Sequence, residues 1–135
     1  MQDFQHPDNP GHLEARINEI LAAADSQGRR IALPAREMYT GRQHTYVVQA
    51  VDQLRALLKD AAHVEFRIIS AGYGLLAEND VIVPYEATFN GMRKADMHRY
   101  ARSVLHLPQK VRDLVAQFDL AFFLLGESYL QVLDI

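Results

Sequence analysis

The chain has 135 residues, which is the length of one domain with a hydrophobic core and leaves no room for a second. Its formal net charge of −3 at pH 7 and its 49% hydrophobic content are typical of a globular protein, and they exclude a general affinity for polyanions. It has no cysteine, which excludes disulfides, thiolate nucleophiles and cysteine-ligated metal centres.

The amino-terminal sequence does not resemble an export signal. It reads MQDFQHPDNPGH, which is polar and acidic, whereas a signal peptide has a basic start and an apolar middle. No apolar run approaches the roughly 20 residues that span a bilayer. We therefore expect a cytoplasmic protein without a membrane segment, folded as a single domain over residues 1–135, with residues 1–11 as a flexible lead-in.

The first half of the chain is predicted to alternate helices with strands. Apolar residues recur at helical spacing over 12–24 and over 43–59, which predicts two amphipathic helices. Short apolar runs at 31–33 and 64–70 are bounded by turn residues and are typical of strands. Residues 35–41 are expected to connect the first strand to the second helix.

The second half continues this alternation. Helices are predicted over 93–106, from Pro108 onward and within 128–135, and the almost wholly apolar run 120–125 (LAFFLL) is predicted to be a central strand. This order indicates an α/β fold with a small, mostly parallel sheet flanked by helices. A sheet of three strands is small, so we expect either a homo-oligomer or a chain derived from a larger ancestral domain.

The stretch 64–86 holds the candidate site. A predicted strand ends at Ser70, and Gly72 and Gly74 then flank Tyr73. Glycine adopts backbone angles closed to other residues and allows close approach to the main chain. Ligands of open α/β sheets bind at the carboxyl ends of strands, so we expect a ligand here. Ser70 lacks the G-x-S-x-G context of a nucleophile, which favours a role in lining the turn.

No cofactor or metal is expected. Residues 72–77 fit the loose dinucleotide pattern G-x-G-x-x-[GA], but 81–84 reads as extended chain where that pattern requires a helix. The six histidines show no close ligand spacing.

One wall of the expected pocket comes from the loop before the second helix. Arg36, Tyr39 and Thr40 offer a cation, an aromatic face and a hydroxyl, which suit a phosphate beside a base. A helix start with a solvated arginine explains the same residues equally well. Tyr129 either contacts the ligand or packs against the first strand.

The opposite wall is acidic and aromatic. Asp80 and Glu86 are candidate catalytic carboxylates, and Tyr85 is a candidate ligand contact. Asp80 is equally explained as a turn former, because aspartate bonds its own following backbone. Pro84 rigidly presents the two residues after it, which favours a role for Glu86.

A basic face is predicted on the helix over 93–106. Arg93, Lys94, Arg99 and Arg102 recur at spacings near three and four. They form either a solvated helix face or a surface that contacts the nucleic-acid backbone.

The ordered motifs resemble a bacterial and phage family of unknown function. Its members show an A-R-x-x-Y-x-[GS] loop, a strand ending in S-A-x-Y-G-L, a D-x-[IV]-x-P-Y segment and a closing G-x-x-Y-L. The matching segments here are 35–41, 70–75, 80–85 and 126–130, so the resemblance covers roughly 34–130. Relatives usually open with a strand ending in a cysteine- or lysine-bearing turn, which this sequence lacks.

More distantly, residues 73–85 are similar to the YaaA peroxide-stress proteins, which bind DNA, and to the uracil-DNA-glycosylase-like part of archaeosine-synthesis enzymes. This resemblance implies a Rossmann-like or glycosylase-like three-layer sandwich. It also implies recognition of a nucleobase or nucleotide in nucleic-acid metabolism, stress response or phage defence. In an enzyme of this kind, Asp80 or Glu86 would assist cleavage of an N-glycosidic bond.

Two alternatives stay open at this point. The first is a non-catalytic module that binds DNA or a protein partner through the basic face of 93–102. The second is a domain that serves only oligomer assembly.

Overall fold

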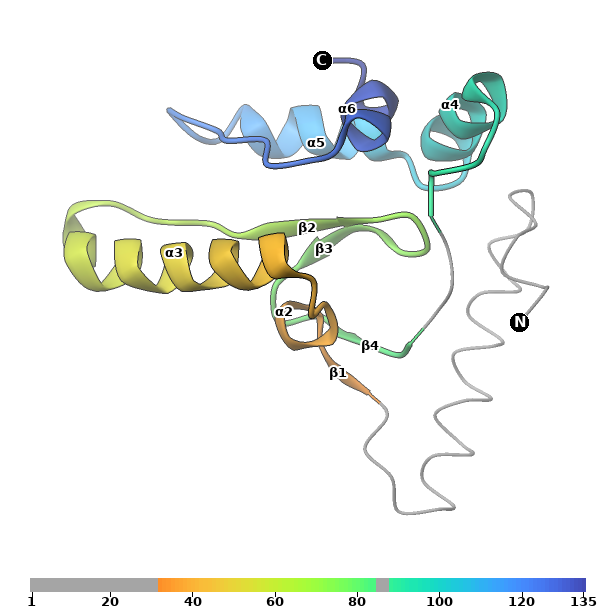
Figure 1. Ribbon diagram of the computed structural model, residues 1–135. Coiled ribbons are helices and arrows are strands. Elements are labelled where there is room, and N and C mark those ends of the chain that lie inside the picture. Colours follow the sequence, from red (N-terminus) through yellow and green to blue (C-terminus); the bar gives the residue numbers. More distant parts are fainter. Residues whose placement is uncertain (1–31, 85–87) are drawn as a thin grey trace.

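The structure is a computed structural model, in which residues 32–84 and 88–135 are described (Figure 1). Its elements are, in chain order, β1 (Leu33–Pro34), α2 (Ala35–Met38), α3 (Arg42–Leu58), the 3-10 turn η2 (Lys59–Ala61), β2 (Arg67–Ser70), β3 (Gly74–Ala77), β4 (Val81–Ile82), α4 (Lys94–Ser103), α5 (Leu107–Val115) and α6 (Glu127–Leu133).

The central feature is an antiparallel hairpin of β2 and β3. The register pairs Arg67 with Ala77 at its open end and Ser70 with Gly74 at its turn. Gly74 has a φ of +82°, a left-handed conformation that side chains disfavour, and this residue lets the chain re-enter the ladder directly after the turn. The glycine-rich turn therefore reverses the direction of the chain between β2 and β3.

A second antiparallel ladder joins β1 to β4, with Leu33 opposite Ile82 and Pro34 opposite Val81. Main-chain bonds extend this contact into α2, where the amide of Ala35 donates to the carbonyl of Asp80 at 2.8 Å. The amide of Arg36 donates to the carbonyl of Glu78, also at 2.8 Å. Segments 33–36 and 78–82 are thus fixed side by side.

The α/β class is confirmed, but the expected mostly parallel sheet and three-layer sandwich are not found. Both ladders of the described residues are two-stranded and antiparallel. The reason lies in the turn at 71–73, which folds β3 back on β2 where a parallel sheet needs a helical crossover.

The predicted strand over 120–125 is wrong. This segment has no regular secondary structure, and Leu120, Phe122 and Leu124 are exposed to 70%, 77% and 57%. Among the described residues, none of its backbone groups joins a ladder. An apolar run predicts a buried strand only where a neighbouring strand is available, and β2 is paired with β3 alone.

The helices α3 to α6 lie where the sequence predicted helices, whereas α2 lies in the segment that was predicted to be a connecting loop. The observed α3 agrees with the predicted 43–59 to within a residue at each end, and α4 ends three residues before the predicted 106. The left-handed backbone of His106, with a φ of 53°, separates α4 from α5. The helix predicted over 12–24 and the lead-in over 1–11 lie outside the described residues.

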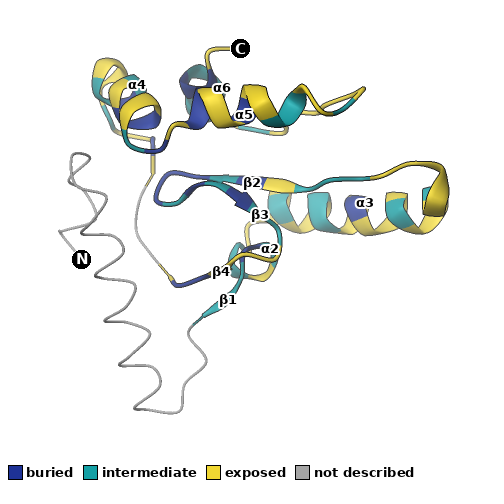
Figure 2. Ribbon diagram, turned by 180° about the vertical axis from the view of Figure 1, so that it is seen from behind, coloured by how far each residue is buried: buried dark blue, intermediate teal, exposed yellow. Residues whose placement is uncertain are grey.

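The two faces of the hairpin pack against different neighbours. Ile69 and Leu75 pack toward α4, α5 and α6, whereas their chain neighbours Ile68 and Leu76 face the opposite way. This alternation is the ordinary period of a strand. Figures 1 and 2 show the three carboxyl-terminal helices on one side of the hairpin, and α2, α3 and the β1–β4 ladder on the other.

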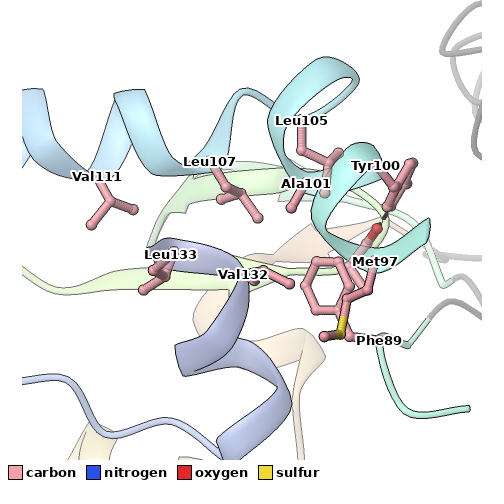
Figure 3. Close-up of a cluster of buried hydrophobic side chains, with 10 residues drawn as sticks. Phe89, Met97, Tyr100, Ala101, Leu105, Leu107, Val111, Val132 and Leu133 are labelled. Carbon is pink, nitrogen blue, oxygen red and sulfur yellow. Dashed lines mark hydrogen bonds between the residues drawn. The ribbon is translucent and has the colours of Figure 1, made fainter. Parts of the chain in front are cut away.

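The larger hydrophobic cluster, here the helical cluster, lies between the three carboxyl-terminal helices and the hairpin (Figure 3). The buried Phe89 packs edge-on against Tyr129, with ring centroids 4.9 Å apart. The hydroxyl of Tyr100 donates to the carbonyl of Ala71 at 2.8 Å. The members of the cluster are Ala71, Phe89, Met97, Tyr100, Ala101, Leu105, Leu107, Val111, Val132 and Leu133.

The smaller cluster, here the strand cluster, consists of Ala35, Ile68, Leu76 and Ile82. Partly buried residues pack against it, including Tyr39 and Tyr73. The predicted A-R-x-x-Y loop and the predicted glycine turn therefore meet at this cluster. No helix within 32–84 or 88–135 is long and apolar enough to cross a membrane.

Candidate functional site

Ser70 organises the turn after β2. Its side chain is buried, and its Oγ accepts hydrogen bonds from the amides of Gly72 at 3.2 Å and Tyr73 at 3.0 Å. These contacts are those of a serine turn, in which the side chain stands in for a backbone acceptor. The structure thus agrees with the lining role for Ser70, and the amide of Gly72 is directed at this hydroxyl.

Tyr73 joins this turn to the end of β4. Its hydroxyl donates to the carbonyl of Val83 at 3.1 Å and accepts from the amide of Val83 at 3.2 Å. Burial raises the pKa of Tyr73 above its ordinary value, although the bond to Val83 works in the opposite direction. The phenol is therefore held in its neutral, hydrogen-bonding form.

Two further tyrosines, Tyr39 and Tyr129, are partly buried on other elements. Burial is the main cause that raises the pKa of Tyr129 on α6, and the nearby Tyr39 raises the pKa of both Tyr129 and Tyr73. Tyr39 follows α2, where it is the C-cap residue. Tyr39 and Tyr73 thus meet at the strand cluster, and Tyr129 packs against the helical cluster.

His44 supports Tyr39 from α3. Its ring centroid lies 5.6 Å from that of Tyr39 and 5.9 Å from that of Phe66. Its Nε2 is 2.8 Å from the carbonyl oxygen of Arg36. His44 thus acts as a packing residue between two rings. The described residues contain no group of three side chains suited to hold a metal ion.

Arg36 lies in a network with two carboxylates. Its Nη1 is 2.7 Å from Glu78 Oε1, and its Nη2 is 2.8 Å from Asp52 Oδ2. The hydrogen bond to Asp52 is the main cause that raises the pKa of Arg36. The structure therefore places the predicted phosphate contact against acids, where a phosphate would have to compete with them.

Arg55 completes this Glu78 network. Its Nη2 is 2.6 Å from Glu78 Oε2, and its Nε and Nη2 donate to the carbonyl of Val64 at 3.1 and 2.8 Å. The hydrogen bond from Arg55 lowers the pKa of Glu78, with Arg36 acting in the same direction. The network, made of Arg36, Asp52, Arg55 and Glu78, joins α2 and α3 to the hairpin and to the segment before β2.

Sequence reasoning missed Asp52, Arg55 and Glu78. The first two are three residues apart on α3, and Glu78 lies in the turn after β3. In the sequence, each of these three residues looks like an ordinary charged surface residue. Only the position of Arg36 between them, fixed by its main-chain bond to residue 78, brings the charges together.

Asp80 is a turn residue in the structure. Its Oδ2 accepts from the amide of Ala77 at 2.8 Å, and its own amide donates to the carbonyl of Ala77 at 3.1 Å. This is the turn-forming role that the sequence left open beside catalysis. Thr40 is exposed. Glu86 and Tyr85 lie outside the described residues.

The basic face of α4 is largely paired with acids. Arg93 and Arg99 lie 2.9 and 3.5 Å from the carboxylate of Asp96, and Arg102 forms an ion pair with Asp134. Lys94, the first residue of the helix, is exposed. This pairing corresponds to the solvated face among the two alternatives, because each acid offsets charge that a polyanion would need.

The comparisons with known proteins give one match. A family model described as a family of unknown function, DUF6884, matches residues 20–135. No match was found among curated proteins or among solved structures. The expected membership in a family of unknown function is thus confirmed. The matched residues include Tyr39, Tyr73 and the Glu78 network.

Proposed function

We propose that this chain, which belongs to the family of unknown function DUF6884, recognises the planar ring of a nucleobase or nucleotide. The observation that carries this proposal is that Tyr39, after α2, and Tyr73, in the turn after β2, pack against the same strand cluster. Aromatic side chains bind bases by stacking, which contributes about 1–3 kcal/mol per base.

The surroundings of the tyrosines favour recognition of the base over recognition of phosphate. The guanidinium of Arg36 contacts both Asp52 and Glu78. The amide of Gly72 is bonded to Ser70. Because these groups already serve the fold, we expect nucleobases and nucleosides to bind as tightly as the corresponding nucleotides.

The proposal extends to catalysis: the bound nucleoside or nucleotide would be cleaved at its N-glycosidic bond. It depends on a carboxylate that orients water or stabilises an oxocarbenium-like cation. The carboxylate of Asp80 is engaged with the amide of Ala77. We therefore assign any such role to Glu86, and Glu86→Gln would then abolish turnover while Asp80→Asn would act mainly on stability.

A thermal-shift titration of the full chain tests the binding function. The probes are adenine, uracil, their nucleosides and their 5′-monophosphates, each at low and moderate salt. A ligand at 100 times its dissociation constant stabilises the folded state by about 2.7 kcal/mol. We expect a shift with a nucleobase or nucleoside that moderate salt does not remove.

Two variants separate the site from the rest of the surface. Tyr39→Ala should abolish the shift, because it removes one stacking face from the site. The matched control is Tyr46→Ala on α3, at a residue that is 62% exposed and belongs to neither hydrophobic cluster, and it should retain the shift. Equal loss in both variants, or no shift in the wild type, would reject the proposal.

The same experiment addresses the DNA-binding alternative. Stabilisation by short oligonucleotides alone, lost as salt rises, would assign binding to a cationic surface such as that of α4. The proposed roles in stress response or phage defence rest on the resemblance to other proteins and follow only if the base-binding site is found.

A further inference from the structure

The described part of the chain contains two asparagines, and both are exposed in turns. Asn79 precedes Asp80 between β3 and β4, and Asn90 precedes Gly91 shortly before α4. The backbone nitrogen that follows an asparagine can attack its side-chain amide, which makes asparagine a thermolabile residue. The attack requires that nitrogen to move toward the side chain, so the local structure decides which asparagine reacts.

At Asn79 the attacking nitrogen is held in place. The amide of Asp80 donates to the carbonyl of Ala77 at 3.1 Å, and its carboxylate accepts from the amide of Ala77 at 2.8 Å. The carbonyl of Asp80 also accepts from the amide of Ala35 at 2.8 Å. Rotation of the peptide between Asn79 and Asp80 would break the first of these bonds, and the other two hold the rest of Asp80.

At Asn90 the corresponding nitrogen is not held. Among the described residues, no hydrogen bond engages the amide of Gly91 or the side chain of Asn90. The turn is closed instead by its neighbours: the amide of Met92 donates to the carbonyl of Phe89 at 3.2 Å, and the amide of Asn90 donates to Thr88 Oγ1 at 3.1 Å.

Gly91 also leaves the space for this movement. Its φ of +87° is that of the third residue of a type II turn. An added Cβ would meet no atom within 4 Å, so the surroundings of Gly91 are open. Because glycine is the residue with the least restricted backbone, the peptide between Asn90 and Gly91 can rotate until the nitrogen faces the side chain.

We propose that Asn90 and Gly91 form a site of spontaneous covalent modification, at which the asparagine is converted to isoaspartate and aspartate. The nitrogen of Gly91 attacks Cγ of Asn90 and forms a C–N bond. The side-chain nitrogen leaves as ammonia and carries away the proton that the Gly91 amide loses. One water molecule then opens the resulting succinimide ring at either of its two carbonyls, so the reaction needs no cofactor.

The two products differ in the path of the main chain. Opening at the main-chain carbonyl of Asn90 gives isoaspartate, which lengthens the chain by one atom between Phe89 and Met92. The hydrogen bond that closes the turn joins these two residues. Phe89 is buried in the helical cluster and Met92 packs against it (Figure 3). Isoaspartate should therefore loosen this cluster as the protein ages.

Peptide mapping by mass spectrometry tests the proposal on the full chain, before and after prolonged incubation at mildly alkaline pH. Cleavage after glutamate puts Asn79 and Asn90 on separate peptides. The Asn90 peptide should gain one mass unit, because OH replaces NH2, and should separate into two isomers. The Asn79 peptide is the control within the same sample and should stay unchanged. No gain at Asn90, or an equal gain at both sites, would reject the proposal.

Two variants test the effect on the helical cluster. Asn90→Gln keeps an amide, but its longer side chain does not readily close the ring, so urea midpoints should fall on ageing in the wild type and stay constant in this variant. Freshly prepared Asn90→Asp carries the new charge without the lengthened chain and should match the fresh wild type. A midpoint as low as that of the aged wild type would assign the loss to charge instead. An aged wild type that is as stable as the fresh protein would reject the loosening.

Discussion

The two faces of the β2–β3 hairpin are closed by different means. The face toward α4, α5 and α6 is covered by the helical cluster, whose members are nearly all apolar. The other face has only four buried residues in the strand cluster, and the Glu78 network lies beside it. The first face should therefore be sensitive to side-chain volume, and the second to charge and pH.

The largest effect is expected from Phe89→Ala in the helical cluster. Phe89 is 1% exposed and packs edge-on against Tyr129, so its removal leaves a cavity. We expect a loss of about 3–5 kcal/mol in the free energy of unfolding, measured by urea denaturation. The control Phe122→Ala, at a residue 77% exposed, should change it by less than about 0.5 kcal/mol at low protein concentration. Similar losses in both variants would contradict the packing described here.

The charge network should show the next largest effect. Glu78→Gln leaves the guanidinium groups of Arg36 and Arg55 facing a neutral amide, and we expect a loss of roughly 2–3 kcal/mol. The side chain of Glu78 is 12% exposed, so solvent only partly screens these pairs. Glu37→Gln, in the exposed part of α2, is the matched control and should be close to neutral. If Glu78→Gln were equally neutral, the network would not stabilise the fold.

The same carboxylate should make this face sensitive to acid. The pKa of Glu78 is lower in the folded state than its ordinary 4.5, mainly through its bond to Arg55. The resulting stabilisation is present above pH 4.5 and is lost as pH falls through the lower, folded-state pKa. Urea midpoints of the wild type should therefore drop more steeply below pH 4.5 than those of Glu78→Gln. Parallel pH profiles for the two proteins would show that another acid is responsible.

Gly74→Ala should have the smallest effect, on the order of 1 kcal/mol of destabilisation in thermal or urea unfolding. Its cause is the φ of +82° at residue 74, since an added Cβ would meet Leu105 only at ordinary contact distances of 3.5 Å and above. At Gly41 an added Cβ meets nothing and φ is −60°, so Gly41→Ala should cost only the few tenths of a kcal/mol by which alanine is the poorer N-cap residue, roughly 0.5 kcal/mol. A neutral Gly74→Ala would show that the hairpin turn tolerates another conformation.

Local patterns in the sequence were sufficient to predict α3 to α6 and the turn after Ser70, but not the short α2. α3 and α4 carry apolar residues at helical spacing, and the glycines of the G-Y-G sequence mark a reversal of the chain. These features depend on residues close together in the sequence. The prediction failed at the pairing of strands, which depends on distant partners. Nothing within 120–125 shows whether a neighbouring strand will be present.

Only part of the candidate site was predicted, because some of its contacts join residues that are far apart in the sequence. The meeting of Tyr39 with Tyr73 was expected from the order of the motifs, and both pack against the strand cluster. The partners of Arg36 were not expected, because Asp52 and Glu78 are 16 and 42 residues away along the chain. Asp80 was assigned two roles, and its contact with Ala77 corresponds to the turn-forming one.

The hydroxyl of Tyr73 occupies both backbone groups of Val83, the residue just after β4. The side chain of Tyr73 thus makes the two hydrogen bonds to Val83 that an adjacent strand would otherwise make. The chain can leave the β1–β4 ladder at this position while the amide and the carbonyl of Val83 stay hydrogen-bonded. Insertions and deletions immediately after Val83 should consequently be tolerated among relatives that keep a tyrosine at position 73, and should be rare in relatives that have lost it.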